Sequence, residues 1–356
     1  MNIIVCILSN ENPAEHENWI KACDDLNVRY NIVDLTRNDW MDKILKGNYN
    51  YFLTQAPGEL SLFKELYDER VYIISKILGF AIYPSLIEIL MHENKRFLSY
   101  WLCAKKIPHP KTDVFYYMNE AIDFINRSDY PIVAKTNIGS TGRGVVILYN
   151  KSDAEKYLIR IFSNKGIRKR IGPNLRMGRL FQRILGVMKK PESIKRKIAK
   201  YKNQYNEIQK GFVLFQQYIP HDFEWRVVKI GDSYFAHKKL VHKGLASGSK
   251  QKIYDNPPLK LLDFVKRMCD EHKLLCQAVD IFEIKQDRFL VNELQTFFGQ
   301  SDKYQMKVNG EIGRYIFKNS KWIFEQGDFN KNESYNLRLQ HVIQILTGKN
   351  GINNIK

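Results

Sequence analysis

The chain has 356 residues, of which 56 are Lys or Arg and 38 are Asp or Glu, so its formal net charge is +18, and 44% of its residues are hydrophobic. This length and composition are typical of a folded globular protein with two or three subdomains. They exclude a membrane-spanning protein, because no apolar run approaches the ~20 residues of a membrane span. The start, "MNIIVCILSN", lacks a basic region and soon turns polar, so it predicts a strand rather than a signal peptide. The five cysteines follow no metal-binding spacing, and a reducing cytoplasm fits them best.

Most of the positive charge lies in one segment of the chain. From Arg160 to Lys210 there are 16 Lys or Arg and two acidic residues, a net charge of +14, while the rest of the chain is nearly balanced. The basicity therefore belongs to one insertion, over about 152–210. It does not indicate that the whole protein binds nucleic acid, and nucleic acid is not expected as a partner.

Residues 1–90 alternate short apolar runs with helical patterns. Helices are predicted over 13–26, beginning at a proline, and over 60–77. Strands are predicted over 3–8, 28–35, 51–55 and 80–85. This alternation is typical of a small open α/β layer.

The rest of the chain continues with both kinds of element and shows no internal repeat. Helices are predicted over 93–105, 119–127, 152–162, 191–209 and 258–273. Strands are predicted on either side of a glycine-rich loop and over 212–219, 225–230, 234–241, 278–284 and 289–294. The last 50 residues are expected to be helical or irregular, with a polar tail.

The stretch "PIVAKTNIGSTGRGVVIL", residues 131–148, joins two apolar runs through a glycine-rich loop. Lys135 ends the first run, and Gly139, Gly142 and Gly144 follow. Glycines let backbone N–H groups approach an anion closely, and a lysine adds a point charge. The stretch therefore suggests a phosphate-binding hairpin, although its spacing matches neither a P-loop nor a dinucleotide-binding fingerprint. An ordinary hairpin turn is the alternative.

A second hairpin is predicted in "QAVDIFEIKQDRFLVNELQTFFG", where two apolar strands flank a turn at 285–288. With a loop of two or four residues, paired positions sum to 573, so Asp280 should lie opposite Glu293, with Gln295 on the same face. Opposed carboxylates destabilise a ladder, and their pKa values should rise. A cation bound between the two carboxylates turns their repulsion into a net attraction, and oxygen ligands suit Mg²⁺. The alternative is a solvated hairpin with two chance acids, and a β-bulge would break the register.

A third hairpin brings basic groups together. With Gly231–Asp232 as its turn, paired positions sum to 463, so Glu224 should face Lys239, with Arg226 on the same surface. Taken alone, this pattern is equally consistent with an ion-pair ladder at the surface, which would contribute little stability.

The order of these parts resembles the ATP-grasp superfamily of carboxylate–amine ligases, which includes D-alanine–D-alanine ligase, glutathione synthetase and the ribosomal-protein glutamate ligases. The order is a lysine leading a helix, the strand lysine with its glycine hairpin, "FQQYIP", "EWRVVKIGD" and the Asp/Glu hairpin. The resemblance covers about 80–300 and is strongest to ATP-grasp proteins of bacterial surface-polysaccharide gene clusters. It implies an α/β (α+β) ATP-grasp fold. The expected parts are an open α/β pre-ATP-grasp domain over 1–90, an N-terminal ATP-grasp subdomain over 91–210 and a C-terminal subdomain over 211–356.

The resemblance also implies a nucleotide site. Two lysines and the glycine loop, which matches the mobile lid over the β- and γ-phosphates, would hold the phosphates: Lys95, Lys135, Gly139, Ser140, Thr141, Gly142 and Gly144. Gln216 would meet the adenine amino group, and the backbones of Gln217 and Ile219 would read the adenine edge. Glu224 would face the ribose.

The reacting groups follow from the same resemblance. The cations around the transferred phosphoryl group would be Arg226 and either Lys239 or Lys238. The magnesium ligands would be Asp280, Glu293 and Gln295.

The chain departs from the family pattern at two positions. The third metal ligand is usually Asn, and here it is Gln295. The segment "KGLASGSK" (243–250) keeps an Ala-Ser-Gly core, which places Ser247 among the catalytic candidates. Leu245 stands where an arginine usually helps to hold an acyl phosphate or a substrate carboxylate.

The implied chemistry needs no covalent enzyme nucleophile. ATP phosphorylates a substrate carboxylate, an amine attacks the acyl phosphate, and phosphate leaves. The implied cofactors are ATP and Mg²⁺. The implied substrates are a small-molecule carboxylate and an amine, which the family context links to sugars of a bacterial surface polysaccharide.

Two other functions are compatible with the sequence. A phosphotransferase on the same fold would also form ADP, but without an acyl phosphate that hydroxylamine can trap. A non-catalytic protein could instead bind a polyanion, or an anionic membrane from the cytoplasmic side, through the insertion. One helical stripe over 174–190 combines basic residues with Leu175, Leu180, Phe181, Ile184, Leu185 and Met188. A basic helix packed on the core is the alternative.

Overall fold

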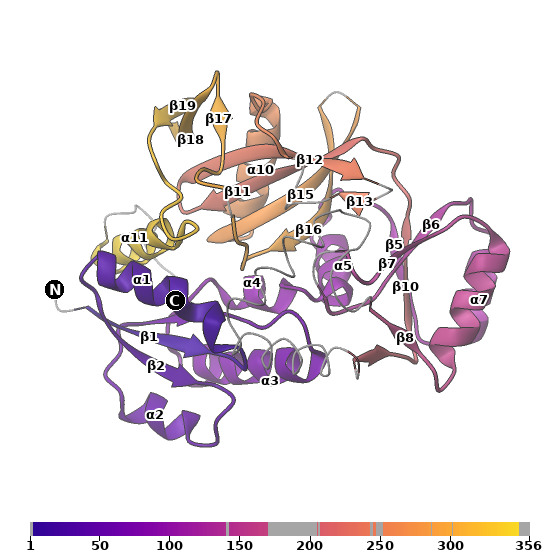
Figure 1. Cartoon of the computed structure of the whole chain (residues 1–356), viewed down its shortest axis with the longest axis horizontal. Helices are drawn as coiled ribbons and strands as arrows, with labels where there is room; N and C mark the ends of the chain where they lie inside the picture. The colour runs from indigo at the N-terminus through magenta and orange to yellow at the C-terminus, as the bar shows by residue number, and fades with distance from the viewer. Residues whose placement is uncertain are drawn as a thin grey trace, which may run out of the picture. The chain divides into compact units, whose positions relative to one another are not determined.

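The computed structural model (Figure 1) describes residues 3–139, 142–169, 205, 207–242, 245–246, 252–285, 287–300 and 302–348. Outside these residues lie Ser140 and Thr141 of the glycine loop, the catalytic candidate Ser247 and the helical stripe over 174–190. The chain forms two compact units. Unit 1 comprises 1–57, 62–110 and 219–356, and unit 2 comprises 58–61 and 111–218.

Unit 1 begins with a parallel sheet in the order β2-β1-β3-β4. Its strands are β1 (Ile4–Ser9), β2 (Arg29–Asp34), β3 (Tyr51–Thr54) and β4 (Ile82–Tyr83). Its helices are η1 (Pro13–His16), α1 (Glu17–Asp25), α2 (Trp40–Lys46) and α3 (Ser61–Tyr72), which continues as the π-helical turn η2 (Ile73–Ile77). Val5 and Ile7 pack in a cluster with α1, whereas Cys6 and Leu8 pack with α2 and α3. Both faces are apolar, which explains the unbroken hydrophobic run of β1 and confirms the predicted open α/β layer.

A larger sheet of unit 1 follows the order β16-β15-β11-β12-β18-β17. The central strands are β11 (Phe223–Ile230), β12 (Ser233–His242), β15 (Cys276–Lys285) and β16 (Arg288–Gln295). The short strands β13 (Leu245–Ala246) and β14 (Lys252–Ile253) pair with β12.

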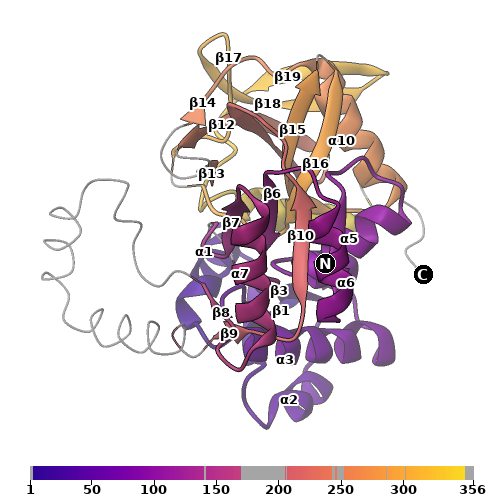
Figure 2. The ribbon, with the colours of Figure 1, turned by 90° about the vertical axis from the view of Figure 1, so that its right-hand side faces the viewer.

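The two faces of the larger sheet carry different residues. Trp225, Val227 and Val279 point to the face covered by α5 (Lys95–Ala104) and α10 (Leu259–Glu271), and Figure 2 shows α10 alongside β15 and β16. Val228 and Ala278 point to the opposite face, where they pack in a cluster with α11 (Tyr335–Thr347). Further along the strands, this second face becomes charged.

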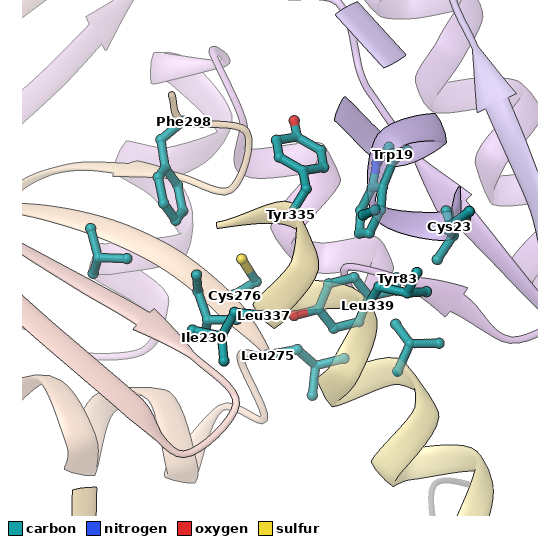
Figure 3. Close-up of a cluster of buried hydrophobic side chains, with 14 of the residues drawn as sticks. Trp19, Cys23, Tyr83, Ile230, Leu275, Cys276, Phe298, Tyr335, Leu337 and Leu339 are labelled. Carbon is teal, nitrogen blue, oxygen red and sulfur yellow. The ribbon is translucent and has the colours of Figure 1, made fainter. Parts of the chain in front are cut away.

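One hydrophobic cluster joins the two sheets of unit 1 (Figure 3). The Trp19 ring of α1 lies edge-on to the ring of Tyr335, with 4.8 Å between ring centroids, and to that of Tyr83 at 6.2 Å. Ile230 and Cys276 bring the end of the larger sheet into the same cluster. The parallel sheet, α11 and the larger sheet therefore share a core.

The expectation for the last 50 residues is wrong in part. They include the strands β17 (Lys307–Val308), β18 (Glu311–Lys318) and β19 (Lys321–Gln326), in addition to α11. Two tight turns connect these strands, and the residues in them have positive φ: Asn309 and Gly310 in the first turn, and Asn319 and Ser320 in the second. An Asn-Gly pair is the preferred sequence of a two-residue hairpin turn, so the first turn carried a signal for the hairpin.

Unit 2 holds an antiparallel sheet in the order β5-β10-β6-β7. Its strands are β5 (Thr112–Phe115), β6 (Ile132–Lys135), β7 (Val145–Leu148) and β10 (Val213–Gln217). Its helices are α6 (Met118–Asn126) and α7 (Lys151–Phe162), whereas the short helix α4 (Leu86–Met91) belongs to unit 1. Ala134 and Phe215 pack beneath α6 and α7, so Lys135 and Gln216 lie on the opposite face. The two strands around the glycine loop are confirmed.

A two-stranded ribbon forms the base of the basic insertion in unit 2. It pairs β8 (Ile167–Arg168) with β9 (Ile208–Gln209). The helix predicted over 191–209 therefore does not reach its predicted end, because its last two residues form this strand, and most of that range lies outside the described residues.

His341 of α11 provides a test of the shared core of unit 1. Its ring is buried, with Nδ1 3.2 Å from the hydroxyl oxygen of Tyr83. Burial, with a further contribution from the charge of Lys229, lowers the pKa of His341 to about 3. An unfolded histidine has a pKa of about 6.5, so the unfolded state binds a proton that the folded state rejects, and stability is lost as the pH falls below that value.

Between pH 7 and pH 5, the wild-type protein is expected to lose about 2 kcal/mol more unfolding free energy than His341→Gln. Urea unfolding of both proteins at the two pH values measures this difference. Parallel losses in the two proteins would show that His341 does not contribute to the acid sensitivity.

Candidate functional site

The charged face of the larger sheet begins with the hairpin of β11 and β12. Glu224 pairs with Lys239 and Arg226 with His237, which confirms the predicted register. The turn falls at the predicted Gly231, whose φ of +55° favours glycine. Lys239 therefore shares a face with Glu224 and Arg226.

The hairpin of β15 and β16 places Asp280 opposite Glu293 and Ala278 opposite Gln295, as predicted. Two register shifts lie between this pair and the turn, one at Asn292 in β16 and one at Ile284 in β15. Each adds one residue to one strand, so the two shifts cancel. The predicted register is therefore correct at Asp280 even though the intervening pairs are offset by one.

Asp280 is the centre of the charged face. Arg226 donates from Nε to Oδ1 at 2.8 Å and from Nη2 to Oδ2 at 2.9 Å, and Lys239 Nζ lies 2.5 Å from Oδ2. The Asp280 side chain is only 2% exposed. This contact is a buried, bidentate ion pair with a second cation, which is incompatible with a solvated ladder.

The expectation that the pKa of Asp280 rises is wrong. Burial alone would raise it, but the charges of Arg226 and Lys239 outweigh burial and hold the pKa of this carboxyl group below its usual range. Strand order explains the difference, because β11 lies next to β15 and places Arg226 directly beside Asp280. The neighbouring strand, rather than the opposed Glu293, therefore decides the charge state.

Lys239 also contacts the ribose-site candidate. Its Nζ lies 2.7 Å from Glu224 Oε2. The other carboxylate oxygen of Glu224 accepts from Asn292 Nδ2 at 3.0 Å and lies 3.8 Å from His221 Nε2. Sequence reasoning missed Asn292, which lies at a β-bulge that the pattern did not indicate.

A further branch of the cluster includes the predicted ligand Gln295 and the helix-leading Lys95. Gln295 Oε1 accepts from Arg226 Nη2 at 3.1 Å, and Gln295 Nε2 donates to Glu93 Oε1 at 2.9 Å. Lys95 Nζ lies 3.7 Å from Glu93 Oε2 and 3.8 Å from Glu293 Oε1. Lys95, Glu293 and Gln295 therefore lie in one cluster, and the predicted shared face of Glu293 and Gln295 is confirmed. Glu93 was missed, although it stands two residues before Lys95.

Lys238 lies on the other face of β12. Its Nζ pairs with Asp255 at 3.0 Å and lies over the rings of Phe223 and Trp225. Of the two lysines that the sequence left open, only Lys239 contacts Asp280.

The glycine loop has a defined frame in unit 2. The Thr136 N–H donates to the Gly144 carbonyl oxygen at 2.9 Å, which closes the loop at its base. Gly144 has no room for a side chain, because a Cβ there would lie 1.7 Å from Thr136 Oγ1. Gly139 and Gly142 have φ of +135° and +65°, which favours glycine at both positions. Ser140 and Thr141 lie outside the described residues.

The adenine-site candidates are each held by a local hydrogen bond. Gln216 lies in β10 and donates from Nε2 to Thr112 Oγ1 at 3.1 Å, and the Gln217 N–H donates to the Lys111 carbonyl oxygen at 2.8 Å. Ile219, in unit 1, has its carbonyl oxygen 2.6 Å from His221 Nδ1.

Comparisons with known proteins address the fold. No protein-family model matches the sequence, and no curated protein matches it. The structure is similar to D-alanine–D-alanine ligase from Bacillus anthracis, with a TM-score of 0.52 and 13% identity over 98% of this chain and 100% of that chain. It is also similar to N5-carboxyaminoimidazole ribonucleotide synthetase from Thermotoga maritima, with a TM-score of 0.53 and 10% identity over 96% of this chain and 76% of that chain.

The chain has the ATP-grasp fold. A third similar structure is carboxyaminoimidazole ribonucleotide synthase from Aspergillus clavatus in complex with ATP, with a TM-score of 0.50 and 11% identity over 87% of this chain and 72% of that chain. The predicted fold class, an ATP-grasp fold preceded by an open α/β layer, is confirmed.

The charged cluster offers oxygen donors of the kind that Mg²⁺ prefers. The cluster contains four carboxylates, of Glu93, Glu224, Asp280 and Glu293, and three cations, of Lys95, Arg226 and Lys239, so its net formal charge is −1. Oxygen ligands and a negative net charge suit Mg²⁺. Among the described residues no three His, Cys, Asp or Glu side chains form a group that could hold a metal, so the candidate set depends on the amide of Gln295.

Proposed function

We propose that the protein is an ATP-dependent ligase that activates a substrate carboxylate as an acyl phosphate and joins it to an amine. The observation that carries this proposal is the buried Asp280–Arg226–Lys239 cluster, on an ATP-grasp fold, at the positions where the family resemblance expects the reacting groups. The products would be ADP, phosphate and an amide. Carboxylate, amine and ATP are small molecules, and the similar structures named as ligases and synthetases support this substrate class.

Arg226 and Lys239 would stabilise the transferred phosphoryl group. Both cations are already fixed by Asp280 and Glu224, so they need not reorganise when charge develops on the phosphoryl oxygens. Preorganised donors of this kind supply a large part of the rate enhancement in phosphoryl and acyl transfer. Burial strengthens the effect, because the surrounding dielectric constant is low.

Asp280, Glu293 and Gln295 would hold Mg²⁺, and the ion would neutralise charge on the β- and γ-phosphates. Glu293 is more accessible than Asp280, with a side chain that is 25% exposed against 2%, and it lies in an ion pair of 3.8 Å with Lys95. The carboxylate oxygens of Asp280 would then contact Mg²⁺ in addition to the side chains of Arg226 and Lys239.

The family resemblance assigns ATP-binding roles to residues of unit 2 and, separately, to residues of unit 1. In unit 2, Lys135 and the glycine loop would hold phosphates, and Gln216 and Gln217 would read adenine. Lys135 and Gln216 share one face of the unit 2 sheet, as a ligand running from phosphate to base requires. In unit 1, Lys95 would hold phosphate, Ile219 would read the adenine edge, and Glu224 would bind the ribose.

The finer substrate assignment is a sugar acid or an amino sugar of a bacterial surface polysaccharide, which rests on the family resemblance. We expect ADP release in the presence of Mg²⁺ when a matching carboxylate and amine are supplied. Hydroxylamine in place of the amine should give a hydroxamate, because only a ligase forms an acyl phosphate. A screen of sugar acids, amino sugars and amino acids measures both products. ADP release with a phosphorylated product and no hydroxamate would identify a phosphotransferase instead.

The basic insertion favours a second role at an anionic surface. Its net charge of +14 would attract anionic lipids or polyanions through a cytoplasmic, peripheral contact. Within the described residues there is no helix long and apolar enough to cross a membrane. Co-sedimentation with anionic liposomes at low and high salt tests this role, because salt screens exposed charges.

A further inference from the structure

The base of the basic insertion reaches the glycine loop inside unit 2. The ribbon of β8 and β9 pairs Ile167 with Gln209 and Arg168 with Ile208, so the two ends of the insertion run side by side. Lys169 follows β8 directly, and Glu207 precedes β9. Three side chains at this ribbon, those of Lys169, Glu207 and Gln209, contact other segments of unit 2.

The first contact is between Lys169 and Gly139. A Cβ at position 139 would lie 2.7 Å from Lys169 Cδ and 3.3 Å from Lys169 Nζ, so the lysine stem lies directly against the glycine backbone. Gly139 also has a φ of +135°. The backbone conformation of position 139 therefore favours glycine, and the absence of a side chain there lets the Lys169 stem lie close to the loop.

The second contact is between Gln209 and the residue at the root of the loop. The Asn137 N–H donates to Gln209 Oε1 at 2.6 Å, and Gln209 Nε2 donates to the Phe212 carbonyl oxygen at 3.3 Å. Asn137 is buried. Replacing the glutamine oxygen would leave a buried backbone N–H without this acceptor, which is costly.

The ribbon is itself fixed to a short segment at the start of α3. Lys169 Nζ donates to the Glu59 carbonyl oxygen at 2.7 Å. Glu207 Oε1 accepts from Ser61 Oγ at 2.7 Å and from the Ser61 N–H at 3.2 Å, and it lies 4.0 Å from Lys169 Nζ. These contacts explain why 58–61 belongs to unit 2 rather than to the layer that surrounds it in the sequence.

We propose that Lys169 and Gln209 are positioning residues for the phosphate-binding glycine loop. Contacts that fix the start of the loop, at Asn137 and Gly139, reduce the conformational entropy that is lost when backbone N–H groups there bind phosphate. The ribbon supplies two fixed points on one side of the loop, at Asn137 and Gly139. Through the ribbon at its base, the insertion would thereby influence nucleotide binding by the glycine loop. This proposal rests on the proposed function, because it takes the loop to bind phosphate.

The test measures the affinity for ADP and for adenosine separately, since a loop that holds phosphates affects only the first. Gln209→Met keeps the length of the side chain but removes the acceptor, and Lys169→Met keeps the stem against Gly139 but removes the cation. Each variant is expected to raise the Kd for Mg²⁺–ADP about tenfold, a change of ~1.4 kcal/mol, and to leave the Kd for adenosine unchanged. Lys169→Arg is expected to restore most of the ADP affinity.

Lys165→Ala is the matched control, because Lys165 is exposed in the same connection and should leave both affinities unchanged. Thermal unfolding of every variant accompanies the titrations. Equal weakening of ADP and adenosine, or a large fall in Tm, would mean that the ribbon only supports the fold, and unchanged ADP affinity would mean that it does not position the loop. Either result overturns this proposal alone. A wild-type protein that binds no adenine nucleotide would overturn the proposed function as well.

Discussion

Asp280→Asn is expected to lower the free energy of unfolding of the ligand-free protein by about 3–5 kcal/mol, the usual cost of removing one partner from a buried ion pair. Arg226 and Lys239 both contact this carboxylate, and the Asp280 side chain is only 2% exposed. The substitution keeps the shape of the side chain but removes the charge that the two cations share. Two neighbouring cations in a buried place then repel each other without a common anion.

Glu293→Gln is the matched variant on the opposite strand. Its side chain is 25% exposed, and its ion pair with Lys95 is 3.8 Å long. An ion pair of this kind contributes little, so the free energy of unfolding should change by less than about 1 kcal/mol. Both variants should nevertheless lose most Mg²⁺-dependent ADP release, because both residues are proposed metal ligands.

Urea unfolding and ADP release, each measured with and without Mg²⁺, separate stability from metal binding. A variant Asp280→Asn as stable as the wild-type protein would show that the Arg226 contact does not contribute as the geometry implies. A variant Glu293→Gln that keeps the wild-type rate of Mg²⁺-dependent ADP release would remove Glu293 from the metal site. The predicted role of Asp280 in stability and the predicted role of Glu293 in metal binding can therefore be contradicted independently.

The pairing within each hairpin could be predicted from the sequence, because turn position and the two-residue period of a strand determine which side chains oppose each other. Glu224 with Lys239 and Asp280 with Glu293 are examples. The bulges at Asn292 and Ile284 could not be predicted from the sequence pattern. The predicted register at Asp280 is nevertheless correct, because the two shifts cancel.

The pairing between hairpins could not be predicted in this way. Arg226 contacts Asp280 because β11 lies beside β15, and 54 positions separate the two residues. No local pattern encodes that adjacency. The sequence pattern indicates only that Asp280 lies opposite Glu293, and this pairing alone predicts the wrong direction for the pKa of Asp280. The contact of Lys169 with Gly139 was missed for the same reason. Family order could suggest which residues act, but not which neighbours set their charge.

Lys135→Ala is expected to lower ATP-dependent ADP release by about 10²-fold or more, the usual effect of removing one preorganised donor from a charged transition state. Lys135 ends β6 beside the glycine loop, and it lies on the face of the unit 2 sheet opposite the one covered by α6 and α7. Its backbone pairs with β7 and with β10, and alanine keeps both ladders. The Tm should therefore stay within about 2 °C of the wild-type value.

Lys111→Ala is the control, because Lys111 precedes the same sheet and its side chain is 78% exposed. It should leave both the rate and the Tm unchanged. Thermal shifts on adding Mg²⁺–ATP give a second measurement that does not depend on the substrate, and the shift of the wild-type protein should be largely lost in Lys135→Ala. A folded Lys135→Ala protein with a near-normal rate and a normal nucleotide-induced shift would show that the lysine is an ordinary strand residue. The phosphate-binding role of the glycine hairpin would then have to be abandoned, because the lysine at its mouth is the charge that distinguishes it from a simple turn.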